Sequence, residues 1–201
     1  MTDLDDSVTP ADGRVARRQR NVNNVLDVIL KMFAEESLFP TIEQAATRSG
    51  LSLRSLYRYF ADPGELLEAA IVRSRELGVD AAHLSQIGKG PLDRRIDDFV
   101  AMRIRLYDQV GPGYRATVAN AARLARIGEE LAQTRNDLRE QFQIQFAKEL
   151  SNHKPSARRD LLAAGDLMTQ LDSIDFLRRH RDLSPTETTS ALKTALSNLL
   201  R

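Results

Sequence analysis

The sequence predicts an all-α protein, and three observations lead to that prediction. Apolar residues recur at steps of three and four along most of the 201-residue chain, which is the spacing of one helix face. Aromatic residues make up only 5% of the chain, and residues that favour turns are few. No segment shows the alternating pattern of a half-buried strand. With 42% apolar residues the chain can bury a substantial core, in one or two domains.

The composition argues against several classes of protein. The chain has no cysteine, so disulfides and thiolate metal sites are excluded. Its three histidines, His83, His153 and His180, lie far apart and outside any zinc-hydrolase spacing. No apolar run approaches the roughly 18 residues that span a bilayer, and the N-terminus is acidic. Since no nucleophile–base pair or phosphate loop is evident either, we expect a soluble, cytoplasmic protein that is not an enzyme and needs no metal or other cofactor.

The pattern divides the chain into four segments. Residues 1–12 are acidic and aperiodic, which predicts a disordered tail. Residues 13–61 form the expected DNA-binding domain, in which a long helix over about 15–36 precedes two short helices. Between Gly13 and Phe60 eight basic residues face four acidic ones, a local excess of four positive charges that suits a polyanion. Residues 62–84 are a linking helix, and residues 85–201 are a second helical domain.

Residues 41–60 carry the signals of a helix-turn-helix. Thr41 is a candidate N-cap, and Gln44 three residues later completes the pattern of a capping box. Gly50 supplies the permissive backbone that a tight turn between two helices needs. The inner positions are small or apolar at helical spacing, and they are occupied by Ala45, Ala46, Leu51, Leu56 and Phe60.

The second short helix leaves a polar and basic face that suits the major groove of DNA. Arginine can bond guanine bidentately, serine is an adaptable partner, and leucine can contact a thymine methyl. We therefore predict that Leu53, Arg54 and Ser55 contact base edges. Hydroxyl and guanidinium groups that bond phosphates fix the register without reading sequence. The residues expected in that role are Arg17, Arg18, Thr41, Ser52, Tyr57, Arg58 and Tyr59. The alternative is that the tyrosines are packing residues and the arginines a solvated face.

Residues 17–72 resemble the N-terminal domain of the TetR (tetracycline repressor) family of transcriptional regulators. The resemblance departs at Pro63, where the family usually has a phosphate-contacting lysine, and at Ala45 and Ser49. Pro63 still fits the first position of a helix that Asp62 caps. The residues that match the family pattern are Ala46, Gly50, Leu51, Ser52, Leu56, Tyr57, Tyr59, Phe60 and Leu66.

The periodicity of the second domain predicts further helices. We expect Gly111-Pro112-Gly113 to stop a helix over 91–110. The helices expected after it cover about 114–127, 129–152 and 157–179, with a final helix that Ser184 and Pro185 begin. The TetR resemblance implies that the last two helices form a homodimer, although an apolar stripe of that width also suits intramolecular core.

The resemblance also implies an effector pocket in the second domain. Arg103 interrupts an apolar stripe between Phe99 and Tyr107, and a buried guanidinium needs a partner. One hypothesis is that Arg103 binds an acidic effector, and the alternatives are an internal salt bridge or a side chain that extends to the surface. The other candidate lining residues, which the same pattern would explain as plain core, are Met102, Leu106, Tyr107, Tyr114, Val118, Phe142 and Phe146.

The function that this resemblance implies is transcriptional regulation. We expect a repressor that binds a palindromic operator in double-stranded DNA as a homodimer and is released by an unknown small-molecule effector. The alternative is a helical small-molecule-binding protein that no longer binds DNA, for which Pro63 and the acidic tail are the hints.

Overall fold

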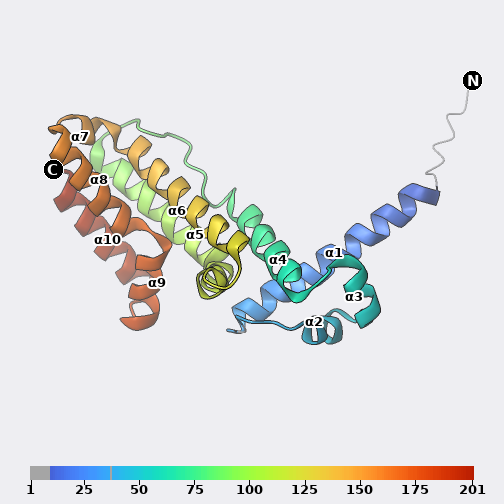
Figure 1. Cartoon of the computed structure of the whole chain (residues 1–201). Coiled ribbons are helices and arrows are strands. Elements are labelled where there is room, and N and C mark those ends of the chain that lie inside the picture. The colour runs from blue at the N-terminus through green and yellow to red at the C-terminus, as the bar shows by residue number, and fades with distance from the viewer. Residues whose placement is uncertain (1–9, 37) are drawn as a thin grey trace, which may run out of the picture.

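The computed structural model describes residues 10–36 and 38–201, and every regular element in those ranges is a helix. Figure 1 shows an elongated molecule with the N-terminal helices at one end and the C-terminal helices at the other. We call α1–α4 the head and α5–α10 the body. The all-α prediction is confirmed. The expected disordered tail lies mostly outside the described residues, but Pro10 and the residues after it already belong to α1.

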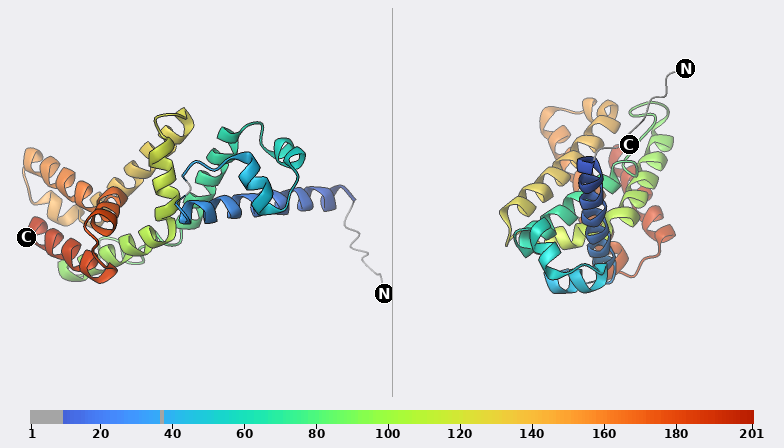
Figure 2. Two further views of the ribbon diagram at one scale, coloured as in Figure 1. Left: turned by 90° about the horizontal axis from the view of Figure 1, so that it is seen from below. Right: turned by 90° about the vertical axis from the view of Figure 1, so that its right-hand side faces the viewer.

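The head consists of one long helix packed against three shorter ones. Figure 2 shows α1 as a straight rod with α2, α3 and α4 on one side of it. The predicted caps are present: Thr41 and Gln44 form a capping box, and Gly50 has the left-handed φ of 70° that the turn requires. Asp62 caps α4. The helices are α1 (Pro10–Ala34), α2 (Ile42–Ser49), α3 (Leu53–Tyr59) and α4 (Pro63–Gly78).

The body is a bundle around one long helix, α5, which contacts the head through α4 and α1. Ser184 and Glu187 form a second capping box, and Pro185 begins the last helix as expected. No helix within the described ranges has both the length and the apolar character needed to cross a bilayer. The bounds are α5 (Leu92–Asn120), α6 (Ala125–Gln145), α7 (Ala147–Ser151), α8 (Pro155–Thr169), α9 (Leu171–His180) and α10 (Pro185–Leu200).

The expected break at Gly111-Pro112-Gly113 is wrong. α5 runs through this triplet for 29 residues, with Pro112 inside the helix. The helix continues because its glycines lie where α4 packs closely against α5. A Cβ on Gly113 would lie only 2.0 Å from Ser74 Oγ of α4. The two helices also meet closely at Gly78, where a Cβ would lie 2.7 Å from a methyl of Val110. The glycines therefore let α4 cross α5 closely, and this packing outweighs the local tendency to end the helix.

Three helices that the periodicity predicts as continuous are each divided. The helix expected over 114–127 belongs to α5 as far as Asn120 and to α6 from Ala125, with residues 121–124 between them. The helix expected over 129–152 is α6 followed by the short α7, with a non-helical ψ of 23° at Phe146. The helix expected over 157–179 is α8 followed by α9, with Gln170 in an extended conformation. None of the three breaks contains proline or glycine. Each turns the next helix so that its apolar residues reach the core, as buried Leu171 and Ile174 show for α9.

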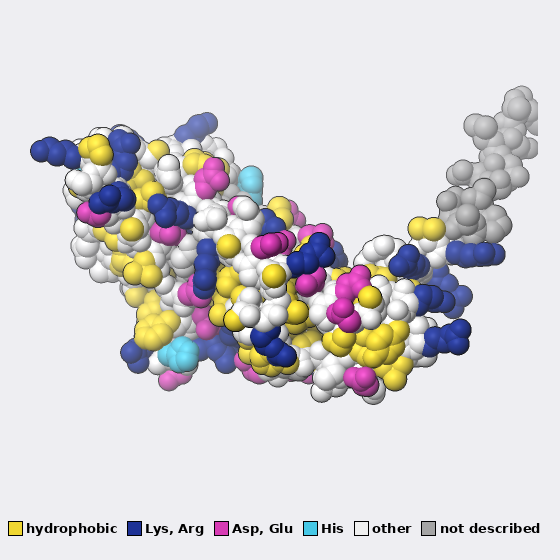
Figure 3. All heavy atoms as spheres, viewed as in Figure 1, with side chains coloured by type: hydrophobic (Ala, Val, Ile, Leu, Met, Phe, Trp, Pro, Cys, Tyr) yellow, Lys and Arg dark blue, Asp and Glu magenta, His cyan; other side chains and the backbone are white. Residues whose placement is uncertain are grey.

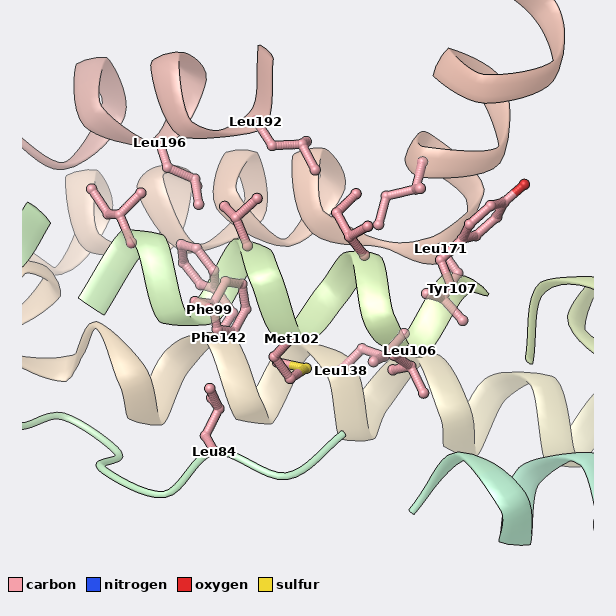
Figure 4. Packing of buried hydrophobic residues seen from close by; sticks show 14 of the residues in the cluster. Leu84, Phe99, Met102, Leu106, Tyr107, Leu138, Phe142, Leu171, Leu192 and Leu196 are labelled. Atoms are coloured by element: carbon pink, nitrogen blue, oxygen red, sulfur yellow. The ribbon is translucent and has the colours of Figure 1, made fainter. Parts of the chain in front are cut away.

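The described part of the chain forms two apolar clusters, one in the head and one in the body. The head cluster lies between α1 and α2–α4, and it includes Ala116 of α5 and Ile127 of α6. The body cluster is organised by aromatic rings, because Phe99 packs edge-on against Phe142 and Phe146 at centroid distances of 5.8 and 5.3 Å. Figure 4 shows side chains of α5 and α6 facing each other in this cluster, with α10 covering them.

Candidate DNA-binding surface and effector cavity

α3 presents its outer face to solvent. Buried Leu56 and Phe60 hold it to the head, which leaves 43% of Leu53 and 51% of Tyr57 exposed. Arg54 and Arg58 are exposed as well. The predicted base contacts Leu53 and Arg54 thus lie on one accessible face.

The serines at the start of α3 are partly engaged with each other. Ser52 is the N-cap, and its hydroxyl oxygen accepts a hydrogen bond from the amide of Ser55 at 3.2 Å. The two hydroxyl groups also lie 3.0 Å apart. Ser55 is half-buried. Thr41, predicted with Ser52 as a phosphate contact, caps α2 in the same way and is exposed.

Tyr59 lies inside the head, unlike Tyr57. Only 9% of its surface is exposed, and its hydroxyl oxygen accepts hydrogen bonds from Asn21 at 3.1 Å and Arg58 at 3.2 Å. These two hydrogen bonds lower the pKa of the Tyr59 phenol. The guanidinium of Arg18 lies 5.9 Å from the ring centroid. This geometry favours the packing interpretation for Tyr59, which ties α1 to α3 and positions Arg58.

A basic cleft opens between α1 and α3. It has a volume of about 590 Å³ and contains four arginines. One of them, Arg14, is not among the residues predicted to contact phosphates. Figure 3 shows Lys and Arg side chains gathered on this end of the head, beside α1. Among the residues that the structure describes, none that lines the cleft carries a carboxylate, so this lining attracts anions. The lining residues are Arg14, Arg17, Arg18, Asn21, Leu51, Ser55, Arg58 and Tyr59.

A separate, mostly apolar cavity of about 200 Å³ lies where α4, α5 and α6 meet. Of the eight predicted ligand residues, Leu106 and Tyr114 line it. Val118 is 40% exposed and lies outside this cavity. The remaining predicted residues pack elsewhere in the body and do not line it, and they are Met102, Arg103, Tyr107, Phe142 and Phe146.

The cavity takes much of its wall from α4, which the sequence predicts only as a linking helix. Ile71, Ser74 and Gly78 face it from α4. At its mouth Arg75 bonds two carboxylates of α6, with Nη1 3.0 Å from Glu130 and Nη2 3.1 Å from Asp137. These residues carried no recognisable motif, because a cavity wall shared by three helices has no fixed spacing in sequence.

Arg103 is fully buried and lies apart from the cavity. It donates to Gln141 Oε1 at 2.5 Å and to the Leu138 carbonyl at 2.6 Å, and its carbon Cζ lies 4.5 Å from the ring centroid of Phe99. Burial lowers the pKa of Arg103 to about 9, and the charge of Asp166 opposes that shift. Neutral acceptors therefore hold the guanidinium. Neither alternative to effector binding describes it, because it does not reach the surface and no carboxylate of the described residues forms a salt bridge with it.

The head and the body are joined by an ion-pair cluster around Glu36. Its carboxylate accepts from Arg115 of α5 at 3.0 Å and from Arg179 of α9 at 2.9 Å. Arg115 also contacts Asp175 of α9 at 3.3 Å. Glu36 has a φ of 64°, which a non-glycine residue adopts only at some cost. The end of α1 is thus held against two helices of the body.

Comparison with solved structures shows which fold this arrangement represents. The crystal structure of a TetR-family transcriptional regulator from Streptomyces coelicolor matches with a TM-score of 0.68, over 90% of this chain and 80% of that one. The chain has the TetR-regulator fold. The likeness lies in the fold, because the two sequences are 20% identical. Comparison with protein-family models and with curated proteins gives no match.

Proposed function

We propose that the protein is a transcriptional repressor that binds double-stranded DNA as a homodimer and is released by a small-molecule effector. The observation that carries the proposal is the basic cleft between α1 and α3, next to the exposed face of α3. The cleft supplies the charge that a phosphate backbone requires, and α3 supplies groups that can contact base edges. The fold shared with a TetR-family regulator supports the same function.

The homodimer is supported by the outer surface of α8–α10. Leu167 of α8 is 70% exposed, and Phe176 of α9 is 46% exposed. Between them an apolar groove of about 420 Å³ runs along α10, with Ala191 and Ala195 in its wall. A contiguous apolar surface of this kind on a charged protein marks an interaction site. A second copy would cover it and would bring two α3 helices to one palindrome, which a single seven-residue helix reads too incompletely.

Release by an effector follows from the position of the cavity. α4 has one end in the head, through buried Leu66 and Leu67, and its other end forms the cavity wall. A ligand that binds better to one placement of α4 shifts the population toward that placement. The spacing of the two reading heads then changes, and the affinity for ligand and the affinity for operator are coupled.

The test begins with selection of bound fragments from a genomic DNA pool, followed by affinity measurements on the selected sequence. We expect Arg54→Ala to relax specificity at one base pair, at a cost of about 1–3 kcal/mol there. Tyr57→Phe should weaken binding evenly across sequences, because a phosphate contact carries no base information.

The matched control is Arg94→Ala, which removes the same charge from an exposed position at the start of α5. It should leave DNA affinity unchanged. An even loss from Arg54→Ala together with a sequence-specific loss from Tyr57→Phe would reverse the two roles.

The competing function is a helical small-molecule-binding protein that does not bind DNA. One observation favours it: Asp62 accepts from the amide of Glu65 at 2.9 Å, so a carboxylate occupies the helix terminus where a phosphate would bind. Gel shifts against genomic fragments over a range of salt concentrations separate the two. Binding that weakens steeply with salt supports the repressor, and no binding even at low salt supports the alternative.

A further inference from the structure

We propose that the effector is a small aromatic monocation, an amine protonated at neutral pH, which displaces Arg75 from Glu130 and Asp137 at the mouth of the cavity. This inference rests on the effector role proposed above and specifies the chemistry of that effector. Three properties of the cavity support it: its size and apolar walls, the balance of charge at its mouth, and the weakness of the ion pairs that close it.

The cavity fits one substituted ring. Its volume of about 200 Å³ is somewhat larger than the roughly 150 Å³ of an apolar cavity that takes up benzene. Its walls are mostly apolar, and the uncharged polar side chains among them are Ser74, Thr117, Thr134 and Tyr114. The Tyr114 hydroxyl donates to Asp172 at 2.6 Å, so this group is already engaged. The walls therefore favour an apolar body and offer little that would bind a polar one.

The charged groups that line the cavity are Arg75, Glu130 and Asp137, two carboxylates and one guanidinium. The carboxylates both belong to α6, and Gln133 donates to Asp137 at 2.6 Å and holds it in place. The single cation comes from α4. An anionic effector would have to approach two carboxylates with only one counterion, which is unfavourable. A cationic effector finds both partners already positioned.

The closing ion pairs are weak enough for a ligand to replace. The side chains of Arg75, Glu130 and Asp137 are all between one third and one half exposed. Ion pairs at such exposure contribute little to stability, because solvent screens them and ordering two side chains costs entropy. The ammonium group of a bound amine would be more shielded, because its own ring fills the apolar cavity behind it. It would therefore compete with Arg75 for the same carboxylates.

The replacement has a consequence for α4. Arg75 of α4 bonds both carboxylates of α6. Its displacement therefore removes two of the polar contacts that hold α4, and with it the head, to the body. Displacement by a cation thus changes the restraint on α4, whereas a neutral ligand would leave the ties in place. The hypothesis of an acidic effector bound by Arg103 has no comparable support, since Arg103 does not line the cavity.

The test compares three probes of similar size and shape on the full-length protein. They are 2-phenylethylamine, which is cationic at neutral pH, 2-phenylethanol, which is neutral, and 3-phenylpropionate, which is anionic. We expect isothermal titration without DNA to show the amine binding at least about tenfold tighter than the alcohol, which corresponds to roughly 1.4 kcal/mol. The carboxylate should not bind at the concentrations that saturate the amine.

Variants locate the binding group. Glu130→Gln with Asp137→Asn should lower the affinity for the amine to that for the alcohol and leave the alcohol unchanged. The matched double variant, Glu68→Gln with Glu76→Gln, removes two carboxylates of α4 outside the cavity and should change neither. Arg75→Met removes the competing cation and should tighten binding of the amine.

Four results would overturn the inference. The first three are equal binding of the three probes, tighter binding of the carboxylate than of the amine, and binding of none of them. The fourth is an amine affinity that does not change when both α6 carboxylates are removed. Selective amine binding that leaves operator affinity unchanged would support the ligand class and overturn effector release instead. The failure of one proposal is therefore distinguishable from the failure of the other.

Discussion

The head and the body bury different kinds of side chain. The described buried residues of the head are apolar apart from Tyr59, which carries a hydroxyl, and Ser74 near the end of α4. The buried polar and charged residues of the described ranges all lie at Ser74 or beyond it, and they include two arginines, Arg95 and Arg103. The head is therefore held by apolar packing and local caps, whereas the body depends on polar contacts between segments distant in sequence.

The two buried arginines of the body are also unlike each other. Arg95 donates to Glu149 at 2.9 Å and to the Gln145 carbonyl at 2.8 Å, so its charge is paired. Arg103 has neutral acceptors and an aromatic ring, and its Nε has no partner. Burial of a charge without a carboxylate is costly, and the surrounding contacts must offset that cost. Arg103 is thus the side chain on which the difference between the two regions can be tested most directly.

The largest effect is expected from Arg103→Ala. The change leaves a cavity and leaves the acceptors on Gln141 and Leu138 unpaired, so we expect a loss of about 3 kcal/mol in the free energy of unfolding. Arg103→Met keeps most of the volume and should lose less than about 2 kcal/mol. Urea unfolding of the three proteins measures both values. A neutral effect of Arg103→Ala would show that the body does not depend on its buried polar contacts.

The contribution of Arg103 to the free energy of unfolding should increase as the pH rises. Burial lowers the pKa of Arg103 to about 9 in the folded protein, well below its value in the unfolded chain. Above pH 9 the unfolded state therefore binds more protons at this site, so its contribution to stability rises with pH. The stability difference between the unsubstituted protein and Arg103→Ala should widen from pH 9 upward. A difference that narrows there would contradict the role of desolvation.

An intermediate effect is expected at the crossing of α4 and α5, where the two regions meet. Gly113→Ala improves helix propensity by about 1 kcal/mol, but its Cβ would clash with Ser74. We expect a net loss of about 2 kcal/mol, because overpacking forces the helices apart. Adding Ser74→Gly removes the clashing atoms and should restore most of the loss. If Gly113→Ala stabilises the protein, helix propensity outweighs the packing of α4 against α5 at this position.

The smallest effect is expected from Glu36→Gln at the junction of head and body. The carboxylate is about half exposed, so we expect a loss of less than about 1 kcal/mol in urea unfolding. Amide hydrogen exchange at the end of α1 should nevertheless be faster, because Arg115 and Arg179 no longer hold it. Glu35→Gln is the matched control, since Glu35 pairs with Arg48 inside the head. Equal amide exchange in both variants would contradict the role of Glu36 in holding the end of α1 against the body.

The sequence by itself determined the features that depend on neighbouring residues. The capping box of Thr41 and Gln44, the left-handed turn at Gly50, and the cap of Asp62 on α4 were all predicted and are all present. Their energetics involve one helix end at a time, so a few adjacent residues contain the whole signal. The all-α class follows for the same reason, from the periodicity of each segment.

Tertiary structure alone decided the continuity of α5, the breaks at Phe146 and Gln170, the partners of Arg103, and the contribution of α4 to the cavity. In each case the deciding contact joins residues far apart in the chain, as Ser74 and Gly113 do. Local propensities differ by about 1 kcal/mol, whereas a steric clash or an unpaired buried group costs more than that. Where local propensity and tertiary packing favour different conformations, packing decides. The pattern of neighbouring residues does not predict the result.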